Sequence, residues 1–275
     1  MKKYKILILS NMVGSGLLED TILKNSFEKE GHFACLESVT YDENLDDEFD
    51  VIIRRNTWVS TSEDTVNLYK NNDKIIERLL KKGKKTVNLV GLDGKGKGYL
   101  CDLFKNYENV LPTIKCKDDI KLLPKAEKYV IKDIKSFGNG LHQRVVKEQE
   151  LEKEYKNGDI VQPFMSFKAE VQCYYVAEKM MYAYEYTPSK YPHYPEPKLI
   201  SLTEKEQKLA DTFAKYSKTK YGLQRIDFLR LQDDSLVLME IEDHAPFMNL
   251  SKLPENILNE FLSEYKASIY NLIEN

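Results

Sequence analysis

The sequence has few of the residues that build metal centres or disulfide frameworks. It contains 4 cysteines, 4 histidines and 1 tryptophan among 275 residues. The cysteines show no CxxC spacing and the histidines no ligand spacing, so we expect neither a zinc site nor disulfide bonds. Reduced, mostly buried thiols are the prediction.

A strong charge of one sign is absent as well. The chain carries 41 basic and 44 acidic residues, which gives a formal net charge of −3, and the two signs are interspersed. Binding to a phosphate backbone needs a positive excess. No nucleic acid partner is therefore expected.

Long hydrophobic runs are missing too. No apolar stretch approaches the ~20 residues that span a bilayer. Met1-Lys2-Lys3 leads into a short strand pattern and does not open a signal peptide. We expect a cytoplasmic protein without a membrane partner.

The hydrophobic pattern of the first part of the chain predicts an α/β domain. Residues 1–90 alternate short apolar runs with helical spacing, which is typical of a parallel sheet covered by helices. Strands are predicted at 4–10, 33–36, 50–54 and 86–90. The glycine-rich and lysine-rich stretch 91–98 marks a domain boundary.

Beyond this boundary the pattern becomes mixed α+β. Thr203 and Glu206 have the spacing of a capping box, which predicts the start of a helix. A final amphipathic helix ends the chain. Further strands are predicted at 128–132, 143–146, 160–162, 170–176 and 179–186, and a hairpin at 224–231 and 236–241 that turns at Asp233-Asp234. The predicted segments are 1–95, 96–162 and 163–275.

The predicted hairpin carries the most informative acidic residues. Arg225-Ile226-Asp227 lies on one strand and Glu240-Ile241-Glu242 on the other, so alternation and antiparallel pairing bring the three carboxylates together. Such a cluster needs cations, and hard oxygen ligands suit Mg²⁺ or Mn²⁺. A solvated acidic hairpin is the alternative interpretation.

A lysine and a glycine-rich loop form a second candidate site. Lys132 ends the strand Tyr129-Val-Ile-Lys132, and the loop residues Ser136, Gly138 and Gly140 follow it. Lysine charge and glycine backbone N–H groups can hold a polyphosphate. This is not a GxxxxGK[ST] loop, and a plain surface hairpin would look similar. The strand ending in Gln162-Pro163-Phe164 offers an apolar surface for adenine.

With these pieces in order, the chain resembles the ATP-grasp superfamily over nearly its whole length. The resemblance implies an α/β N-terminal pre-ATP-grasp domain with a parallel sheet, followed by an α+β ATP-grasp fold of two lobes. The spacing from Asp227 to Glu240 is similar to that of D-alanine–D-alanine ligases. The segments 53–58, 97–100 and 240–246 resemble the glutathione-synthetase-like branch that contains the cyclo-ligase group of D-cycloserine biosynthesis.

The resemblance implies an ATP-dependent carboxylate–amine ligase that works through an acyl phosphate and releases ADP and phosphate, with ATP and Mg²⁺ or Mn²⁺ as cofactors. It implies metal ligands (Asp227, Glu240, Glu242), ATP-binding residues (Lys97, Lys132, Ser136, Gly138, Gly140, Gln162, Pro163, Phe164, Glu170) and catalytic residues (Arg225, Lys132). Two positions depart from the pattern. Glu242 stands where many members have Asn, and Gln172 where related ligases often have Arg.

The substrates are expected to be a small-molecule carboxylate and an amine. Candidate substrate-binding residues are Arg55, Ser15 and Asn249, with a lid of Tyr186, Tyr191, His193 and Tyr194. Each has an alternative role. Ser15 could belong only to a tight turn, and Asn249 could cap the following turn. Arg225 could form a salt bridge to the carboxylates. Rival functions are a nucleotide-binding regulatory protein, an intramolecular cyclo-ligase and a kinase. Related ligases suggest a homodimer.

Overall fold

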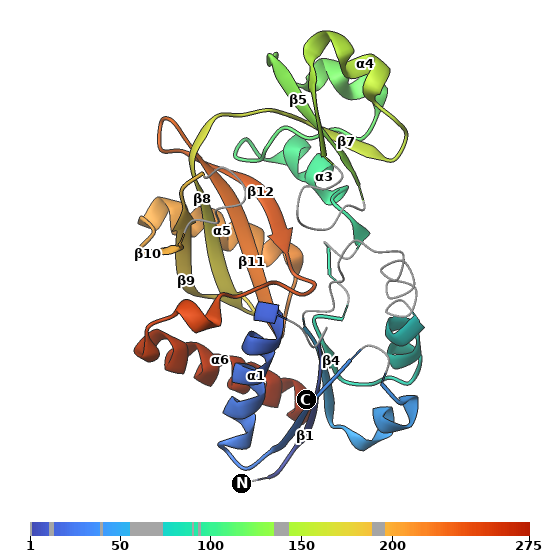
Figure 1. The fold of residues 1–275 in the computed structure, drawn as a ribbon, viewed down its shortest axis with the longest axis vertical. Coiled ribbons are helices and arrows are strands. Elements are labelled where there is room, and N and C mark those ends of the chain that lie inside the picture. Colours follow the sequence, from blue (N-terminus) through green and yellow to red (C-terminus); the bar gives the residue numbers. More distant parts are fainter. Residues whose placement is uncertain are drawn as a thin grey trace.

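The computed structural model describes residues 2–10, 14–38, 41–55, 74–89, 91–92, 95–134, 143–188 and 196–275. The chain builds three sheets, with strand orders β2-β1-β3-β4, β6-β5-β7 and β10-β9-β8-β11-β12. Figure 1 shows the first sheet at one end of the molecule, the second at the other end and the third between them.

The first sheet is parallel, as the sequence predicts. Strands β1 and β3 pair with each other at its centre, β2 pairs with β1 at one edge and β4 pairs with β3 at the other. Helix α1 (Gly14–Glu28) packs beside this sheet. Ile6, Leu7 and Ile8 in succession are fully buried, because a parallel strand covered on both faces needs apolar residues at every position. The strands are β1 (Lys5–Leu9), β2 (Phe33–Glu37), β3 (Val51–Arg54) and β4 (Thr86–Val87), and Glu43–Glu48 forms the 3-10 helix η1.

The second sheet is antiparallel and belongs to the small lobe. Strand β5 (Lys128–Asp133) pairs with β6 (Gln143–Lys147) on one side and β7 (Asp159–Pro163) on the other. Ile131 and Val161 are buried in a core of this lobe's own. Its short helices are η3 (Lys117–Leu122), η4 (Glu148–Glu150) and α4 (Leu151–Glu154).

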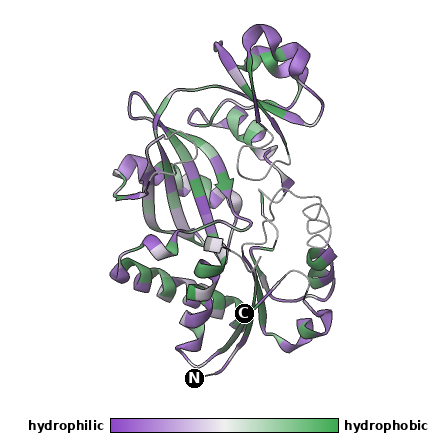
Figure 2. Ribbon diagram, in the orientation of Figure 1, coloured by the Kyte–Doolittle hydropathy of each residue, from purple (hydrophilic) through white to green (hydrophobic). Residues whose placement is uncertain are grey.

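The third sheet is also antiparallel. Helix α5 begins at the predicted capping box, since the Thr203 hydroxyl accepts from the Glu206 N–H and the Glu206 carboxylate accepts from the Thr203 N–H. The elements are β8 (Phe167–Val176), β9 (Lys179–Tyr186), β10 (Lys198–Ile200), α5 (Glu204–Ser217), β11 (Leu223–Leu231), β12 (Leu236–Glu242), η5 (Leu250–Lys252) and α6 (Glu255–Glu274). Figure 2 shows α6 with hydrophilic and hydrophobic residues along its whole length, as an amphipathic helix requires.

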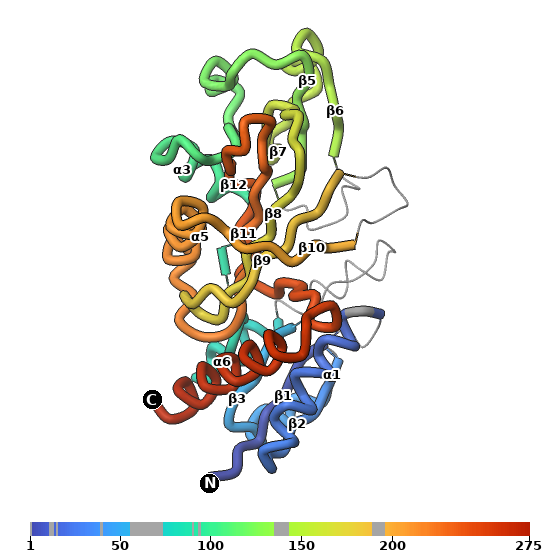
Figure 3. Tube along the Cα trace, turned by 90° about the vertical axis from the view of Figure 1, so that its left-hand side faces the viewer, coloured from blue at the N-terminus to red at the C-terminus, as the bar shows by residue number. Residues whose placement is uncertain are grey.

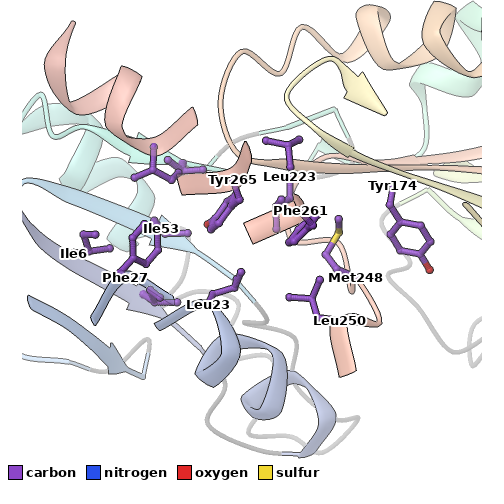
Figure 4. Close-up of a cluster of buried hydrophobic side chains, with 14 of the residues drawn as sticks. Ile6, Leu23, Phe27, Ile53, Tyr174, Leu223, Met248, Leu250, Phe261 and Tyr265 are labelled. Carbon is purple, nitrogen blue, oxygen red and sulfur yellow. The ribbon is translucent and has the colours of Figure 1, made fainter. Parts of the chain in front are cut away.

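One hydrophobic core joins the first domain to the large lobe. Leu23 and Phe27 of α1 pack with Phe261 and Tyr265 of α6 (Figure 4). Figure 3 shows α1 and α6 side by side. The first and third sheets are therefore packed into one body, and the small lobe has a separate core.

Helix α3 (Tyr99–Asn106) packs against the large lobe. Leu100 and Leu103 share a core with Phe213 of α5. The N–H of Leu111 also donates to the carbonyl of Leu238 at 2.9 Å. The predicted segment 96–162 grouped α3 and Leu111 with the small lobe. In the structure both contact the large lobe.

Two sequence predictions about composition can be compared with the structure directly. The four cysteines are free, with Cys101 and Cys173 buried and Cys116 exposed. Among the described residues, no helix has the length and apolar character needed to cross a membrane.

Candidate active site

A β-bulge on β12 brings the acidic residues to one face of the third sheet. Phe228 pairs with Leu238, but the next residue, Asp227, pairs with Glu240, so Met239 is the extra residue. In a regular register Asp227 would pair with Met239, and the side chain of Glu240 would lie on the opposite face. The bulge therefore places Glu240 and Glu242 on the face that carries Arg225 and Asp227.

We call this side of the sheet the carboxylate face, defined by Glu170, Asp227, Glu240 and Glu242. Asp227 pairs with Gln172 of β8, and Glu170 lies two residues away on that same strand. The other side of the sheet is closed by α5 and α3. Among the described residues, these four acidic side chains thus gather on the face opposite the helices.

Arg225 connects two of these carboxylates. Its guanidinium donates to both oxygens of Asp227 at 2.8 and 2.7 Å and to Glu242 at 2.8 Å. It also donates to the carbonyl of Phe247 at 3.0 Å. Burial raises the pKa of Glu242 to about 8, and it raises the pKa of Asp227 although Arg225 opposes the shift.

Lys97 and Lys132 supply the other positive charges. Lys97 Nζ lies 2.6 Å from Glu240 Oε1. Burial by itself would raise the pKa of Glu240, but the charge and hydrogen bond of Lys97, together with the charges of Lys132 and Arg225, hold that pKa below its usual value. Burial, and after it the charge of Lys97, lowers the pKa of Lys132 to about 8. Both ammonium groups are therefore close to the metal candidates.

Glu170 is oriented by its neighbours on the same strand. Gln172 Nε2 donates to Glu170 Oε1 at 2.7 Å, and Tyr174 donates its hydroxyl proton to Gln172 Oε1 at 2.6 Å. Burial, together with the charge of Asp227, raises the pKa of Glu170. The family pattern marks Gln172 only as a departure and does not single out Tyr174, although strand alternation puts both side chains on the face of Glu170.

The carboxylate oxygens of this face are the kind of ligand that a hard divalent cation prefers. Burial is the largest cause of the raised pKa values of Glu170, Asp227 and Glu242, and a bound divalent cation would favour the charged forms of these carboxylates. Within the described parts of the chain, however, no group of three or more His, Cys, Asp or Glu side chains is arranged to hold a metal ion. Binding a cation would require the carboxylates to exchange their ion pairs with Arg225 and Lys97.

The residues predicted to bind adenine, Gln162, Pro163 and Phe164, lie at the end of β7. Gln162 is 1% exposed, and its Nε2 donates to Thr113 Oγ1 at 3.0 Å. Pro163 is the last residue of the strand and pairs with Tyr129. Phe164 follows with 54% exposure, an unusual value for a phenylalanine. The structure thus presents an accessible ring beside a buried polar side chain.

The predicted substrate residues are mostly engaged by protein groups. Arg55 is fully buried and donates to Glu19, to Asp20 and to the carbonyl of Pro246. Asn249 Nδ2 donates to the hydroxyls of Tyr174 and Tyr186. A direct contact of Arg55 with substrate stays a prediction, and it would require these bonds to be exchanged.

Several predicted positions lie outside the described residues. They are the loop residues Ser136, Gly138 and Gly140, the side chain of Ser15, and the lid candidates Tyr191, His193 and Tyr194.

Comparisons with known proteins identify the fold. No protein-family model matches the sequence, and no curated protein matches it. A crystal structure of D-cycloserine synthetase DcsG has a TM-score of 0.72 at 14% identity, covering 98% of this chain and 99% of that one. The ATP-grasp ligase PsnB complexed with a minimal precursor has a TM-score of 0.67 at 11% identity, covering 97% and 100%.

A third solved structure extends the likeness to another ligase. D-alanine–D-alanine ligase from Bacillus anthracis complexed with ATP has a TM-score of 0.66 at 13% identity, covering 98% of this chain and 97% of that one. The chain thus has the fold of the ATP-grasp ligases over nearly its whole length. The fold class predicted from the sequence, a parallel-sheet domain followed by a two-lobed ATP-grasp fold, is confirmed.

Proposed function

We propose that this chain is an ADP-forming ligase that uses ATP to activate a carboxylate and joins it to an amine. The observation that carries the proposal is the carboxylate face, where Lys97 and Glu240 lie beside Asp227 and Arg225 on one buried sheet surface. Such a set suits a nucleotide polyphosphate with its metal ion. The fold shared with ATP-grasp ligases supports the same conclusion.

ATP would lie between the small lobe and the carboxylate face. Lys132 and Lys97 would bind phosphate oxygens, and the ring of Phe164 with the backbone beside Gln162 would receive the adenine. Glu170 would contact the ribose. The loop that contains Ser136, Gly138 and Gly140 would cover the phosphates, as the resemblance implies.

Asp227, Glu240 and Glu242 would hold Mg²⁺ or Mn²⁺, which when bound neutralises charge on the phosphate oxygens. Lys97 would then move its ion pair from Glu240 to a phosphate oxygen. Arg225 would keep Asp227 in place and present positive charge where the carboxylate is phosphorylated.

The chemistry requires little covalent work from the protein. A carboxylate oxygen attacks the γ-phosphorus, the bond to the bridging oxygen breaks and ADP leaves. The amine nitrogen then attacks the acyl carbon, phosphate leaves with the bonding pair, and the nitrogen loses a proton. The residues described here hold and orient the reactants and balance their charge.

The test is ADP release from Mg²⁺-ATP against a matrix of amino acids, dipeptides and ureido or hydroxamate carboxylates, with mass spectrometry of the products. A product equal to carboxylate plus amine minus water, formed together with ADP, is the expected result. ADP formation that needs no amine and yields a stable phosphorylated product would instead identify a kinase.

Ring closure within one molecule is a second candidate, because a D-cycloserine synthetase has this fold. It predicts a product equal to one substrate minus water. If Mg²⁺-ATP binds but no carboxylate and amine in the matrix release ADP, the ligase proposal fails in favour of a nucleotide-binding regulatory protein.

A further inference from the structure

The side chain of Asn249 sets the direction of a chain of hydrogen bonds across the carboxylate face. Its Nδ2 donates to the oxygens of Tyr174 and Tyr186, each at 2.9 Å. Asn249 has a φ of 55°, a left-handed conformation that asparagine tolerates better than most residues. The residue is thus well suited to a fixed position between the two tyrosines.

The two hydroxyls that Asn249 contacts are both left to act as donors. Tyr174 accepts from Asn249 and gives its proton to Gln172, which in turn donates to Glu170. Tyr186 likewise accepts from Asn249 and hydrogen-bonds with the Tyr174 hydroxyl, so an acceptor on a ligand would draw the Tyr186 proton away from Tyr174. Figure 4 shows Tyr174 at the edge of the hydrophobic cluster with its hydroxyl turned away from Phe27.

Tyr186 lies next to the groups that would handle ATP. It pairs directly with Glu170 across β8 and β9 and is only partly buried. Burial raises its pKa, so the hydroxyl keeps its proton at neutral pH. Arg225 is close enough to oppose that shift by its charge. A hydroxyl proton and a guanidinium on one surface favour a ligand that is an acceptor and carries negative charge.

A second observation concerns the neighbouring tyrosine of β9. Tyr184 lies two residues before Tyr186 on the same face of β9 and is 2% exposed. Among the described residues, its hydroxyl has no hydrogen-bond partner. A buried polar group of this kind is costly unless something binds it. Gln172, in contrast, already bonds to protein groups through both ends of its amide.

We propose that the Tyr186 hydroxyl donates a hydrogen bond to the carboxylate of the substrate, and that Asn249 is the positioning residue that fixes this direction. The proposal rests on the proposed ligase function. It assigns recognition of the carboxylate to β9 and to the segment after β12.

The experiment separates activation of the carboxylate from use of the amine. The substrate is the carboxylate of the matrix that supports the fastest ADP release. Hydroxylamine replaces the amine and traps the acyl phosphate as a hydroxamate. Tyr186→Phe removes only the hydroxyl, and Asn249→Gly removes the amide while allowing positive φ. Tyr107→Phe is the matched control, because this ring packs against Phe213 on the opposite side of the sheet.

We expect Tyr186→Phe to raise KM for the carboxylate roughly 10- to 100-fold, as loss of a hydrogen bond to a charged group does. KM for ATP and the affinity for Mg²⁺-AMPPNP should match those of the unsubstituted chain. Asn249→Gly should raise the same KM but add little in the Tyr186→Phe background, because the two residues act as a unit. Tyr107→Phe should change neither constant.

Each other outcome has a definite meaning. An unchanged carboxylate KM in Tyr186→Phe, or a rise confined to KM for ATP, overturns the assignment of Tyr186 and leaves the ligase proposal intact. Additive effects of the two substitutions overturn the positioning role of Asn249. Failure of the unsubstituted chain to release ADP with any carboxylate, with Mg²⁺-AMPPNP still bound, rejects the ligase proposal itself.

Discussion

Glu240 and Lys132 occupy different elements but act on the same region of the carboxylate face. Glu240 comes from β12 and is paired with Lys97 at 2.6 Å, while the pKa of Lys132 on β5 is lowered by burial and by Lys97. Neither side chain stabilises a hydrophobic core. Both positions fit the proposed site, where each side chain would face a metal-bound phosphate.

The first prediction is that Glu240→Gln and Lys132→Ala each lower the rate of ADP release by ~100-fold or more, because each removes charge that a metal-bound phosphate needs. The thermal midpoint should stay close to that of the unsubstituted chain. Asp234→Asn is the control, since Asp234 is an exposed acid at the turn of the same hairpin. Near-normal turnover in both site variants would refute the site.

The second prediction concerns pH. The pKa of Lys132 is lowered to about 8, chiefly by burial, and a bound phosphate would favour its protonated form. The contribution of Lys132 to the affinity for Mg²⁺-AMPPNP is therefore fully present below this pH and is lost as the pH rises through about 8. Glu242, whose pKa is also raised to about 8, would act in the opposite direction, because it favours the metal ion once it has lost its proton. Titration calorimetry between about pH 7 and about pH 9.5 measures the affinity. Lys132→Arg stays protonated, so its affinity relative to that of the unsubstituted chain should rise through about pH 8. A ratio of the two affinities that does not change with pH would contradict the prediction.

At the level of elements, the sequence predicted strands better than their register. The predicted strand 179–186 is β9 as observed, and the hairpin turns at Asp233-Asp234 as predicted. The sequence did not predict strand β10 or helix α3. Strand β10 has 3 residues, too few to show a hydrophobic period, and α3 directly follows a glycine-rich stretch that indicates a loop. Local pattern identifies such long, alternating strands reliably and short elements poorly.

The bulge at Met239 shows why the site needed the structure. Sequence spacing suggested that Asp227 and Glu240 meet, which is correct, but regular pairing from the observed turn would have separated them. Nothing in the residues around Met239 marks a bulge. The ion pairs of Arg225 and Lys97 also depend on long-range packing, so the alternative of a salt bridge to Arg225 could not be decided from sequence.

The segment after β12 is held residue by residue. Arg55 donates to the carbonyl of Pro246, Arg225 to that of Phe247, and Tyr182 to that of Met248. The carboxylate of Glu19 accepts from the N–H groups of Met248 and Leu250 at 3.0 Å. This segment is thereby fixed at once from α1, from the residue after β3, and from β9 and β11.

The third prediction tests this fixation. Glu19→Ala should lower the free energy of unfolding by about 3–5 kcal/mol, because it removes one of the two carboxylates paired with the buried Arg55 and the acceptor of two buried N–H groups. Urea unfolding measures the loss. Glu28→Ala is the matched control on the same helix, since its ion pair with Lys24 is exposed and contributes ~0.5 kcal/mol or less. Equal effects of the two substitutions would show that the segment is not held by Glu19.

At the scale of the whole molecule, the distribution of cores defines which parts unfold together. The core shared by α1, α6 and the third sheet makes the first domain and large lobe one unit. Asn88 strengthens this joint, because its side chain donates to the carbonyls of Leu223 and Asp243 and accepts from the Leu223 N–H. The small lobe has its own core between β5 and β7.

The fourth prediction follows from these two cores. Phe27→Ala and Ile131→Ala each create a cavity that costs about 2–5 kcal/mol, but in different units. Hydrogen exchange followed by mass spectrometry should show Phe27→Ala accelerating exchange in α1, α6 and β8 together, and Ile131→Ala accelerating it in β5 and β7 alone. ATP that binds between the units would couple them, so saturating Mg²⁺-AMPPNP should slow exchange in the small lobe of both variants. If Ile131→Ala speeds exchange throughout the chain without nucleotide, the molecule is a single cooperative unit, and nucleotide binding does not create the coupling.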